Sequence, residues 1–233
     1  MIDWQERTVM LLGEEAMARL AKARVTVVGA GGVGAYAAEM LVRAGIGHIT
    51  VIDNDAVGVT NINRQLVALH STVGMDKVDV LRSRLLDINP DLDFEAVREY
   101  VCEENMVIGH PDYVVDAIDT LSPKIALIQY CMRNSIPLVS SMGSGAKMDA
   151  TAVRVADISK TYQCPLAHML RKRLHKLGIH EGFTAVFSAE MPRKESMVLE
   201  ESRNKKSQVG TISYLPAVFG CVCAQATIEG ILK

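Results

Sequence analysis

The glycine-rich sequence GAGGVG is the feature that most constrains the fold of this chain. It supplies Gly29, Gly31 and Gly34, follows a β-branched run at 24–28, and opens a segment at 33–44 whose apolar residues recur at helical spacing. Glycines at this spacing allow a tight turn between a strand and a helix, and they let backbone N–H groups approach phosphates. The flanking strand and helix favour a nucleotide-binding turn over an ordinary glycine turn.

Strands and helices alternate beyond this motif. Asp53 ends the second strand about 20 residues later, where a carboxylate binds ribose hydroxyls in nucleotide-binding units. Alternation of this kind implies βαβ units. We therefore predict an α/β fold with a doubly wound, mostly parallel, Rossmann-like sheet, with strands at 24–28, 48–53, 113–116 and 137–141 and helices at 33–44, 77–88 and about 122–134.

The pattern changes after Ser141, so we expect an elaborated C-terminal third. Two further strands are predicted at 152–157 and 184–189, with a basic helix at 165–177 between them. The polar stretch 191–210 is interpreted as a mobile surface loop.

We expect a single domain over residues 1–233, with a nucleotide-binding core at about 20–145 and a substrate-facing extension at about 146–233. The segment 212–232 is long and apolar, but Gln225 and Glu229 interrupt it. A membrane span is one interpretation, and a helix buried against the sheet or at a dimer interface is the other. The polar interruptions favour the buried helix, so no membrane partner is expected.

Composition and charge narrow the class of protein. A net charge of −2 gives no overall basic field, so any contact with RNA must come from a local patch. The five cysteines are odd in number and scattered, which is typical of a reducing cytosol and not of a disulfide framework. The first residues, MIDWQERT, lack the basic and apolar regions of a signal peptide. A cytoplasmic location is therefore expected.

Polar and charged side chains follow the ribose-binding acid. NAD enzymes share the glycine motif, but NAD is not cut at its phosphates and needs no converging arginine and lysine. An enzyme that transfers AMP does need them, because negative charge develops on the triphosphate as pyrophosphate leaves. Arg64 and Lys77 taken singly are also explained as solvated surface charges. As a set, the residues favour ATP: Asp55, Asn61, Asn63, Arg64, Gln65 and Lys77.

Two carboxylates lie at the end of the third strand. Asp116 is its last residue, and Asp119 follows just beyond. Ligands of open α/β sheets bind at the carboxyl ends of strands, and Mg²⁺ prefers oxygen ligands while keeping several waters. Asp119 is therefore predicted as a magnesium ligand. For Asp116, a magnesium role and a structural role that caps the following turn remain equally open.

Several segments together resemble a known superfamily. RTVMLLG, GAGGVG, VIDNDAV, TNINRQ, VGMDKV and VVDAID look like the ubiquitin-activating-type (ThiF-type) adenylyltransferases, over a match from about Arg7 to Gly145. In the second half, GSGAKMD, RVADISKTYQCPLA and the basic helix resemble the tRNA threonylcarbamoyladenosine dehydratases. With that segment the resemblance covers most of the chain.

The resemblance implies roles for individual residues. The three glycines would cradle ATP, Asp53 would bind the ribose with Asp55 nearby, and Asp119 would hold Mg²⁺. Arg7 matches an arginine that, in related adenylyltransferases, reaches the triphosphate from the partner subunit, which implies a homodimer. An exposed terminal charge is the alternative for Arg7. The residues implied to contact the triphosphate are Asn61, Arg64, Gln65 and Lys77.

The cysteines depart from one branch of the superfamily. Members that activate ubiquitin-like proteins often carry two CxxC pairs that bind structural zinc, and this chain has no CxxC, so no zinc is expected. Cys221 and Cys223 have the wrong spacing and lie in an apolar segment, where cysteine packs as a small hydrophobe. Cys164 lies near cations and is either a reactive thiol or, as we favour, a structural one.

A dense basic cluster marks the predicted helix at 165–177. The resemblance favours contact between this cluster and tRNA phosphates, and a solvated helix face is the alternative. No aromatic residue interleaves the cluster, so it is expected to touch phosphates and not to stack on bases. The predicted tRNA-binding residues are Lys160, Arg171, Lys172 and Arg173.

The resemblance implies a reaction. ATP would adenylate the carboxylate of threonylcarbamoyladenosine in tRNA, and the ureido group would then attack, close a ring and release AMP, so that the net change is a dehydration. The alternative enzyme adenylates the C-terminus of a ubiquitin-like sulfur carrier, and a sulfur-relay protein is a further candidate partner. A nucleotide-binding scaffold without catalysis is a third interpretation, and the triphosphate-binding residues argue against it.

Overall fold

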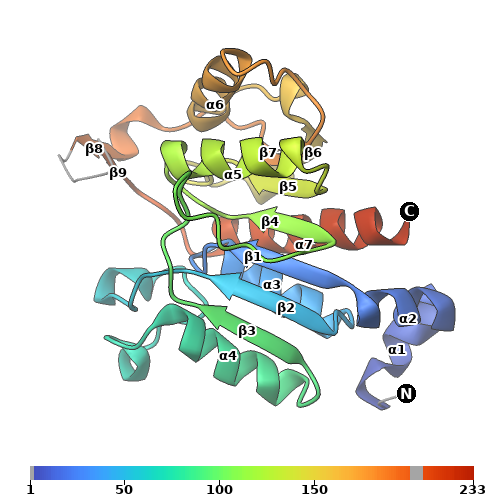
Figure 1. The fold of residues 1–233 in the computed structure, drawn as a ribbon. Helices are drawn as coiled ribbons and strands as arrows, with labels where there is room; N and C mark the ends of the chain where they lie inside the picture. The colour runs from blue at the N-terminus through green and yellow to red at the C-terminus, as the bar shows by residue number, and fades with distance from the viewer. Residues whose placement is uncertain (1–2, 200–206) are drawn as a thin grey trace.

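A seven-stranded sheet forms the centre of the computed structural model, which describes residues 3–199 and 207–233 (Figure 1). The strand order is β3-β2-β1-β4-β5-β7-β6, and only β6 runs antiparallel to its neighbour. The winding reverses between β1 and β4, and ligands bind at such a reversal in doubly wound sheets. The strands are β1 Arg24–Val28, β2 His48–Ile52, β3 Asp93–Val97, β4 Tyr113–Asp116, β5 Leu138–Ser141, β6 Val153–Asp157 and β7 Thr184–Ser188.

Helices cover the sheet in two layers, each with its own hydrophobic cluster. Neighbouring residues of a strand belong to opposite layers: Tyr113 and Val115 join the cluster with α2, α3, α4 and α7, and Val114 joins the cluster with α5 and α6. The α-helices are α1 Glu6–Leu12, α2 Glu14–Lys22, α3 Gly34–Arg43, α4 Lys77–Ile88, α5 Leu121–Arg133, α6 Pro165–His175 and α7 Tyr214–Leu232, and short 3-10 turns cover Asp3–Gln5, Val59–Asn61, His70–Thr72, Ala150–Ala152, Ile158–Lys160 and Lys194–Ser196.

The predicted α/β class and the alternation of strands and helices are confirmed, with boundaries shifted by one or two residues. In the seven-stranded sheet and the α-helices around it, three described elements were not predicted: helices α1 and α2, and the edge strand β3. β5 pairs directly with β7, so the predicted division near residue 145 runs through one continuous sheet.

The predicted loop at 191–210 is wrong in part. Within its described residues, Met197–Leu199 (β8) and Ser207–Val209 (β9) form a small antiparallel pair. Residues 200–206 of the predicted loop lie outside the described part of the chain. Backbone hydrogen bonds from Ala146 to Gly210 and from Arg193 to Ala146 tie this segment to the turn after β5.

Helix α7 is long and apolar enough to cross a membrane by composition alone. In the structure it packs against α3 and against strands β4 and β5, and Leu215, Phe219 and Cys223 are fully buried there. Burial raises the pKa of the Cys223 thiol to about 12, as expected for a cysteine packed as a small hydrophobe. These contacts confirm the interpretation of this segment as a helix buried against the sheet.

An ion-pair cluster joins α3 to α4. Glu39 of α3 is only 5% exposed, and its carboxylate accepts hydrogen bonds from Arg84 of α4 and, at 2.9 Å, from Arg43. Burial opposes ionisation, but the two arginines outweigh it and lower the pKa of Glu39. The cluster fixes α4, whose first residue is Lys77, relative to the helix that follows the glycine motif.

Candidate active site

The glycine motif forms a tight turn between β1 and α3, at the carboxyl edge of the sheet. Gly29 has a φ of +100°, and a Cβ there would lie 2.9 Å from the Ala117 carbonyl oxygen. At Gly34 a Cβ would lie 1.7 Å from the carbonyl oxygen of Gly29, so no side chain fits. The two glycines let the turn close on itself and lie against the residues that follow β4. The N-terminus of α3 consequently opens toward the switch point, where its N–H groups favour an anion.

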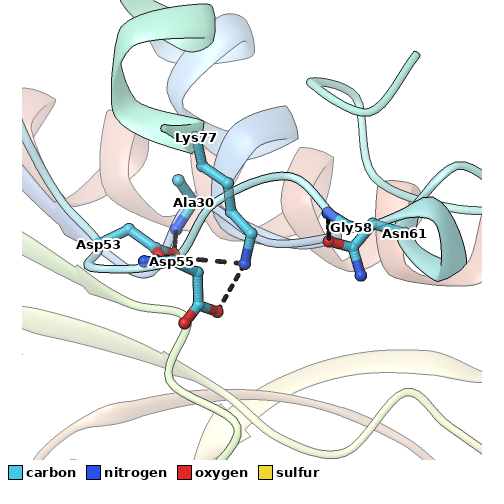
Figure 2. A network of polar contacts seen from close by, with 6 residues as sticks. All are labelled: Ala30, Asp53, Asp55, Gly58, Asn61 and Lys77. Carbon is cyan, nitrogen blue, oxygen red and sulfur yellow. Dashed lines mark hydrogen bonds and ion pairs between the residues drawn. The ribbon is translucent and has the colours of Figure 1, made fainter. Parts of the chain in front are cut away.

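Asp53 lies directly beside this turn (Figure 2). Its carboxylate accepts hydrogen bonds from the backbone N–H groups of Ala30, at 2.6 Å, and Asp55, at 2.8 Å. Burial raises its pKa, and the Lys77 ammonium and the two N–H groups only partly offset this effect. A carboxylate fixed next to the glycine turn is placed as the ribose ligand of a bound nucleotide must be.

Lys77, the first residue of α4, is held in the same network (Figure 2). Only 4% of the residue is exposed, and its Nζ lies 2.7 Å from Asp55 Oδ2 and 3.9 Å from Asp53 Oδ1. A solvated surface lysine would not be buried against two carboxylates, so that interpretation of Lys77 is wrong. Asp55 itself is exposed, with 63% of its side chain accessible. The buried ammonium is therefore paired with a solvent-exposed carboxylate.

Arg64 and Gln65 lie on the other side of the glycine turn. A Cβ on Gly32 would be 3.6 Å from Arg64 Cγ, and a Cβ on Gly31 would meet only Gln65 Nε2, at 3.9 Å. The Arg64 guanidinium donates to the carbonyl of Thr60 and to Asn63 Oδ1, at 3.1 and 2.8 Å.

Gln65 is 9% exposed, yet its side-chain oxygen has no hydrogen-bond partner in the described part of the chain. A buried amide oxygen without a partner is costly, and a ligand with donor groups at this position would satisfy it. Together with the open space over Gly31, this orphaned atom shows that the turn fits a bound nucleotide. Asn61 is nearer to the backbone of its own loop, because its Oδ1 accepts from the N–H of Gly58 at 3.0 Å (Figure 2).

Asp116 has a structural role. It is fully buried, and its carboxylate accepts hydrogen bonds from Lys124 Nζ at 2.7 Å, Ser140 Oγ at 2.6 Å and the backbone N–H of Ile118 at 3.1 Å. Because these bonds occupy the carboxylate inside the protein, it is not available to a metal. The bond from Ile118 caps the turn after β4, as the structural interpretation of Asp116 predicted. Lys124 is also fully buried, and sequence reasoning missed its pairing with Asp116, because it lies eight residues away on the next helix.

Asp119 is exposed, two residues beyond the Ala117 carbonyl that abuts the glycine turn. Among the described residues no group of three or more histidines, cysteines or acids is arranged to hold a metal by itself. A single exposed carboxylate matches the way Mg²⁺ is held at nucleotides, where phosphate oxygens and waters complete the shell. The donor set at this edge therefore fits a magnesium ion that arrives with ATP.

A second buried lysine was missed by sequence reasoning. Lys147 follows β5, is 3% exposed, and donates from Nζ to the carbonyl of Ser188 at 2.9 Å. Burial lowers its pKa, although the charges of Cys164 and Glu190 act in the opposite direction. Ala146 before it has a φ of +58°, a strained conformation for a residue with a side chain. The end of β5 next to β7 thus contains a fixed cation, which lies in the segment GSGAKMD but was not singled out from the sequence.

Arg7 is far from the glycine turn of its own chain. It lies exposed on α1, which packs with α2 before the start of β1, whereas the nucleotide-site residues follow the strand ends (Figure 1). A five-residue strand spans about 15 Å, which separates the two edges of the sheet. Within one chain, Arg7 and the glycine turn therefore do not meet.

The predicted basic cluster divides into outward and inward residues. Lys160, Lys172 and Arg173 are exposed on α6 and on the turn that α6 packs against, and we refer to these three residues as the basic surface. Arg171 instead points inward: its guanidinium donates to the hydroxyl of Thr161 and, at 2.8 Å, to the Thr161 carbonyl. Successive helical residues differ by about 100° in direction, so a run of cations in the sequence cannot share one face.

Cys164 precedes α6 and is 5% exposed within the hydrophobic cluster that also contains Leu170 and Phe187. A thiol buried to this extent is shielded from reagents, even though the buried Lys147 is near enough to interact with it. The structural interpretation of Cys164 is the one that this environment favours.

Comparison with known proteins gives a consistent result. The ThiF family model matches residues 5–233. The chain is 48% identical over 254 residues to the tRNA threonylcarbamoyladenosine dehydratase of Escherichia coli (strain K12), covering 98% of this chain and 94% of that protein. It is 39% identical over 245 residues to the protein of the same name from Bacillus subtilis (strain 168), covering 100% and 96%. A crystal structure of the E. coli enzyme in complex with ATP superimposes with a TM-score of 0.89 at 39% identity, covering 98% of this chain and 95% of that one. The glycine turn and its surrounding cations thus occur in a chain that belongs to the ThiF family.

Proposed function

We propose that this protein is an ATP-dependent tRNA threonylcarbamoyladenosine dehydratase. The observation that carries the proposal is the convergence of Asp53, Gln65 and Lys77 on a glycine turn that has an orphaned buried oxygen and open space above it. The E. coli and B. subtilis relatives described above bear this name and are matched over nearly their whole length, and the E. coli enzyme was crystallised with ATP. A NAD enzyme would not need the buried lysine.

The reaction has two steps. First, a carboxylate oxygen of the threonylcarbamoyl group attacks the α-phosphorus of ATP, and pyrophosphate leaves. Then a nitrogen or oxygen of the ureido group attacks the activated carbonyl carbon, one ureido proton is released, and the bond to AMP breaks. Ring closure is intramolecular, so positioning supplies much of the rate.

The residues of the chain have distinct tasks in this scheme. The turn at Gly29–Gly34 binds phosphates through backbone N–H groups, and Asp53 binds the ribose. Lys77 exchanges its partner Asp55 for the triphosphate, and Arg64 neutralises the charge that grows on the departing pyrophosphate. Asp119 holds Mg²⁺, which neutralises phosphate charge when bound. Asn61 supports the loop that carries Arg64.

A homodimer completes the site in this proposal. Arg7 lies at the opposite edge of the sheet from its own glycine turn, so only a second copy can bring it to the triphosphate. Arg7→Ala should therefore lower turnover, and mixing it with an Arg64→Ala chain should restore activity in the heterodimers that hold one intact site. A mixture that stays as inactive as its components would contradict the shared site.

The basic surface is proposed to bind tRNA phosphates. Replacing Lys172 and Arg173 together with Ala should weaken tRNA binding and lower the slope of log affinity against log salt by about 0.7–0.9 for each lost phosphate contact. ATP affinity should not change. Filter binding over a salt series measures both quantities, and an unchanged slope would show that these cations only solvate a helix face.

The reaction itself is tested by incubating purified protein with ATP, Mg²⁺ and tRNA that carries threonylcarbamoyladenosine. Mass spectrometry of the digested nucleosides should show the mass of one water lost from that nucleoside, with one AMP formed per event. Asp119→Asn is the inactive control, and Arg64→Ala should form the product much more slowly than the wild type. Pyrophosphate release that requires a ubiquitin-like carrier protein, with no change in the tRNA, would refute the proposal and support carrier activation. The cytoplasmic location and a sulfur-relay partner remain predictions.

A further inference from the structure

An exposed aromatic ring lies beside the basic surface, although the predicted basic helix itself contains no aromatic residue. Tyr162 lies between the turn Ile158–Lys160 and α6, and it is 50% exposed. Its ring and the Phe187 ring of β7 form a T-shaped pair, with centroids 5.2 Å apart and planes at 75°. Phe187 is 1% exposed, so the contact anchors Tyr162 to the core. One part of the tyrosine ring is therefore fixed, and the rest is open to solvent.

The backbone that carries Tyr162 is also fixed. Thr161 is 4% exposed, its N–H bonds to the Ile158 carbonyl at 3.2 Å, and the Arg171 guanidinium holds both its carbonyl and its hydroxyl. Gln163 has a φ of +51°, in the left-handed region that residues with side chains rarely adopt. Such strain persists where the surroundings hold the backbone in one conformation. A ring that is already immobilised loses little entropy when a ligand stacks on it.

The position of the ring connects the two proposed sites. Phe187 precedes the last residue of β7, at the carboxyl edge of the sheet, and β7 is separated from β4 by β5 alone. The ends of β4 and β7 are therefore about 10 Å apart, two strand spacings, and Asp119 follows β4. Lys172 and Arg173 are exposed on α6, which packs against the turn Ile158–Lys160 that precedes Tyr162. Tyr162 thus lies between the adenylation site and the basic surface.

We propose that Tyr162 is a stacking platform for an unpaired nucleobase of the RNA substrate. Proteins bind single-stranded RNA by combining cations that contact the backbone with aromatic faces on which bases stack, and both parts are present here. The basic surface alone would bind paired and unpaired RNA equally. The inference rests on the proposed function, and it adds that the enzyme selects a splayed loop base next to the reacting nucleoside.

The test compares two RNAs of equal length, a stem-loop with an unpaired loop and a blunt duplex. Tyr162→Leu keeps an apolar side chain over Phe187 but removes the aromatic face. It should weaken stem-loop binding about 5- to 150-fold, the equivalent of the ~1–3 kcal/mol of one stacked base. Tyr162→Phe and Tyr162→Trp should bind as the wild type does. Duplex binding, and the salt slope for both RNAs, should not change, because no charge is removed.

Tyr100→Leu is the matched control, because Tyr100 is 42% exposed and follows β3 on the far side of the sheet. Equal stem-loop affinity in wild type and Tyr162→Leu would overturn the platform, as would an equal loss for stem-loop and duplex. A loss confined to binding of a ubiquitin-like carrier protein would also overturn it. Failure of the wild type to bind the stem-loop would instead refute the proposed function, so the two failures are distinct.

Discussion

The buried ion pair between Lys124 and Asp116 gives a prediction whose magnitude follows from its surroundings. Both side chains are fully buried and lie 2.7 Å apart. Lys124→Met replaces the cation with an apolar chain of similar length and leaves a buried carboxylate without its counter-ion. Breaking a buried pair from one side costs about 3–5 kcal/mol. The hydrogen bonds from Ser140 and Ile118 remain, so we expect a loss near the lower limit, about 3 kcal/mol.

The loss should be visible in thermal unfolding. For a chain of this size, each kcal/mol shifts the Tm by about 2–4 °C, so Lys124→Met should unfold about 6–12 °C below the wild type. Urea unfolding followed by circular dichroism gives the free energy directly, and an unchanged m value would show that the denatured state is not altered. Lys22→Met, at an exposed lysine of α2, is the control and should change stability by about 0.5 kcal/mol or less.

The double variant Asp116→Asn with Lys124→Met separates pairing from packing. Removing both charges leaves no unpaired ion, so the double variant should regain at least half of the stability that Lys124→Met loses. A loss below about 1 kcal/mol in the single variant, or a double variant less stable than the single one, would refute the reasoning. The double variant should also weaken ATP binding. The Asp116 carboxylate that it lacks holds the turn after β4, and the Ala117 carbonyl of that turn abuts Gly29.

Three further outcomes are expected. Gly31→Ala should fold normally, because its Cβ would meet only Gln65 Nε2 at 3.9 Å, but calorimetry should show that it binds ATP about tenfold more weakly or worse. Gly34→Ala, in contrast, should not give a stable fold. Arg64→Ala should release pyrophosphate at about a hundredth of the wild-type rate at saturating ATP. The pKa of Glu39 is lower in the folded than in the unfolded state, so its contribution to stability is full above pH 4.5 and is lost as the pH falls further. Urea unfolding at pH values on both sides of 4.5 should therefore show that Glu39→Gln loses less stability on acidification than the wild type does.

The sequence predicted the parts of the fold that local pattern encodes. Buried parallel strands read as short β-branched runs, and the glycine spacing fixed the turn between β1 and α3. The edge strand β3 was missed because polar and apolar residues alternate only from Asp93 to Ala96, which is too short a run to identify a strand. The helix α1 was missed for a different reason: it buries no residue, so its pattern carries no core-facing stripe.

The candidate site was predictable in composition but not in pairing. Asp53 and Lys77 were expected near a nucleotide, yet nothing in their spacing says that Lys77 is paired with Asp55 in the free protein. Lys124 and Lys147 were missed because buried lysines have no sequence signature and their partners come from other elements. Arg171 was predicted to face RNA, but its direction depends on the contact with Thr161, which forms only in the folded chain.

Helix α7 has a consequence for the order in which the protein is made. It is synthesised after every other described element, yet it packs against α3, which follows directly on the glycine turn, and Pro216 lies 3.1 Å from where a Cβ on Gly32 would be. On the ribosome, the apolar side of α3 therefore stays uncovered until α7 emerges, and such exposed surface attracts chaperones and favours aggregation. A nascent chain arrested before Tyr214 should hold all of the nucleotide-binding residues and still not bind ATP tightly.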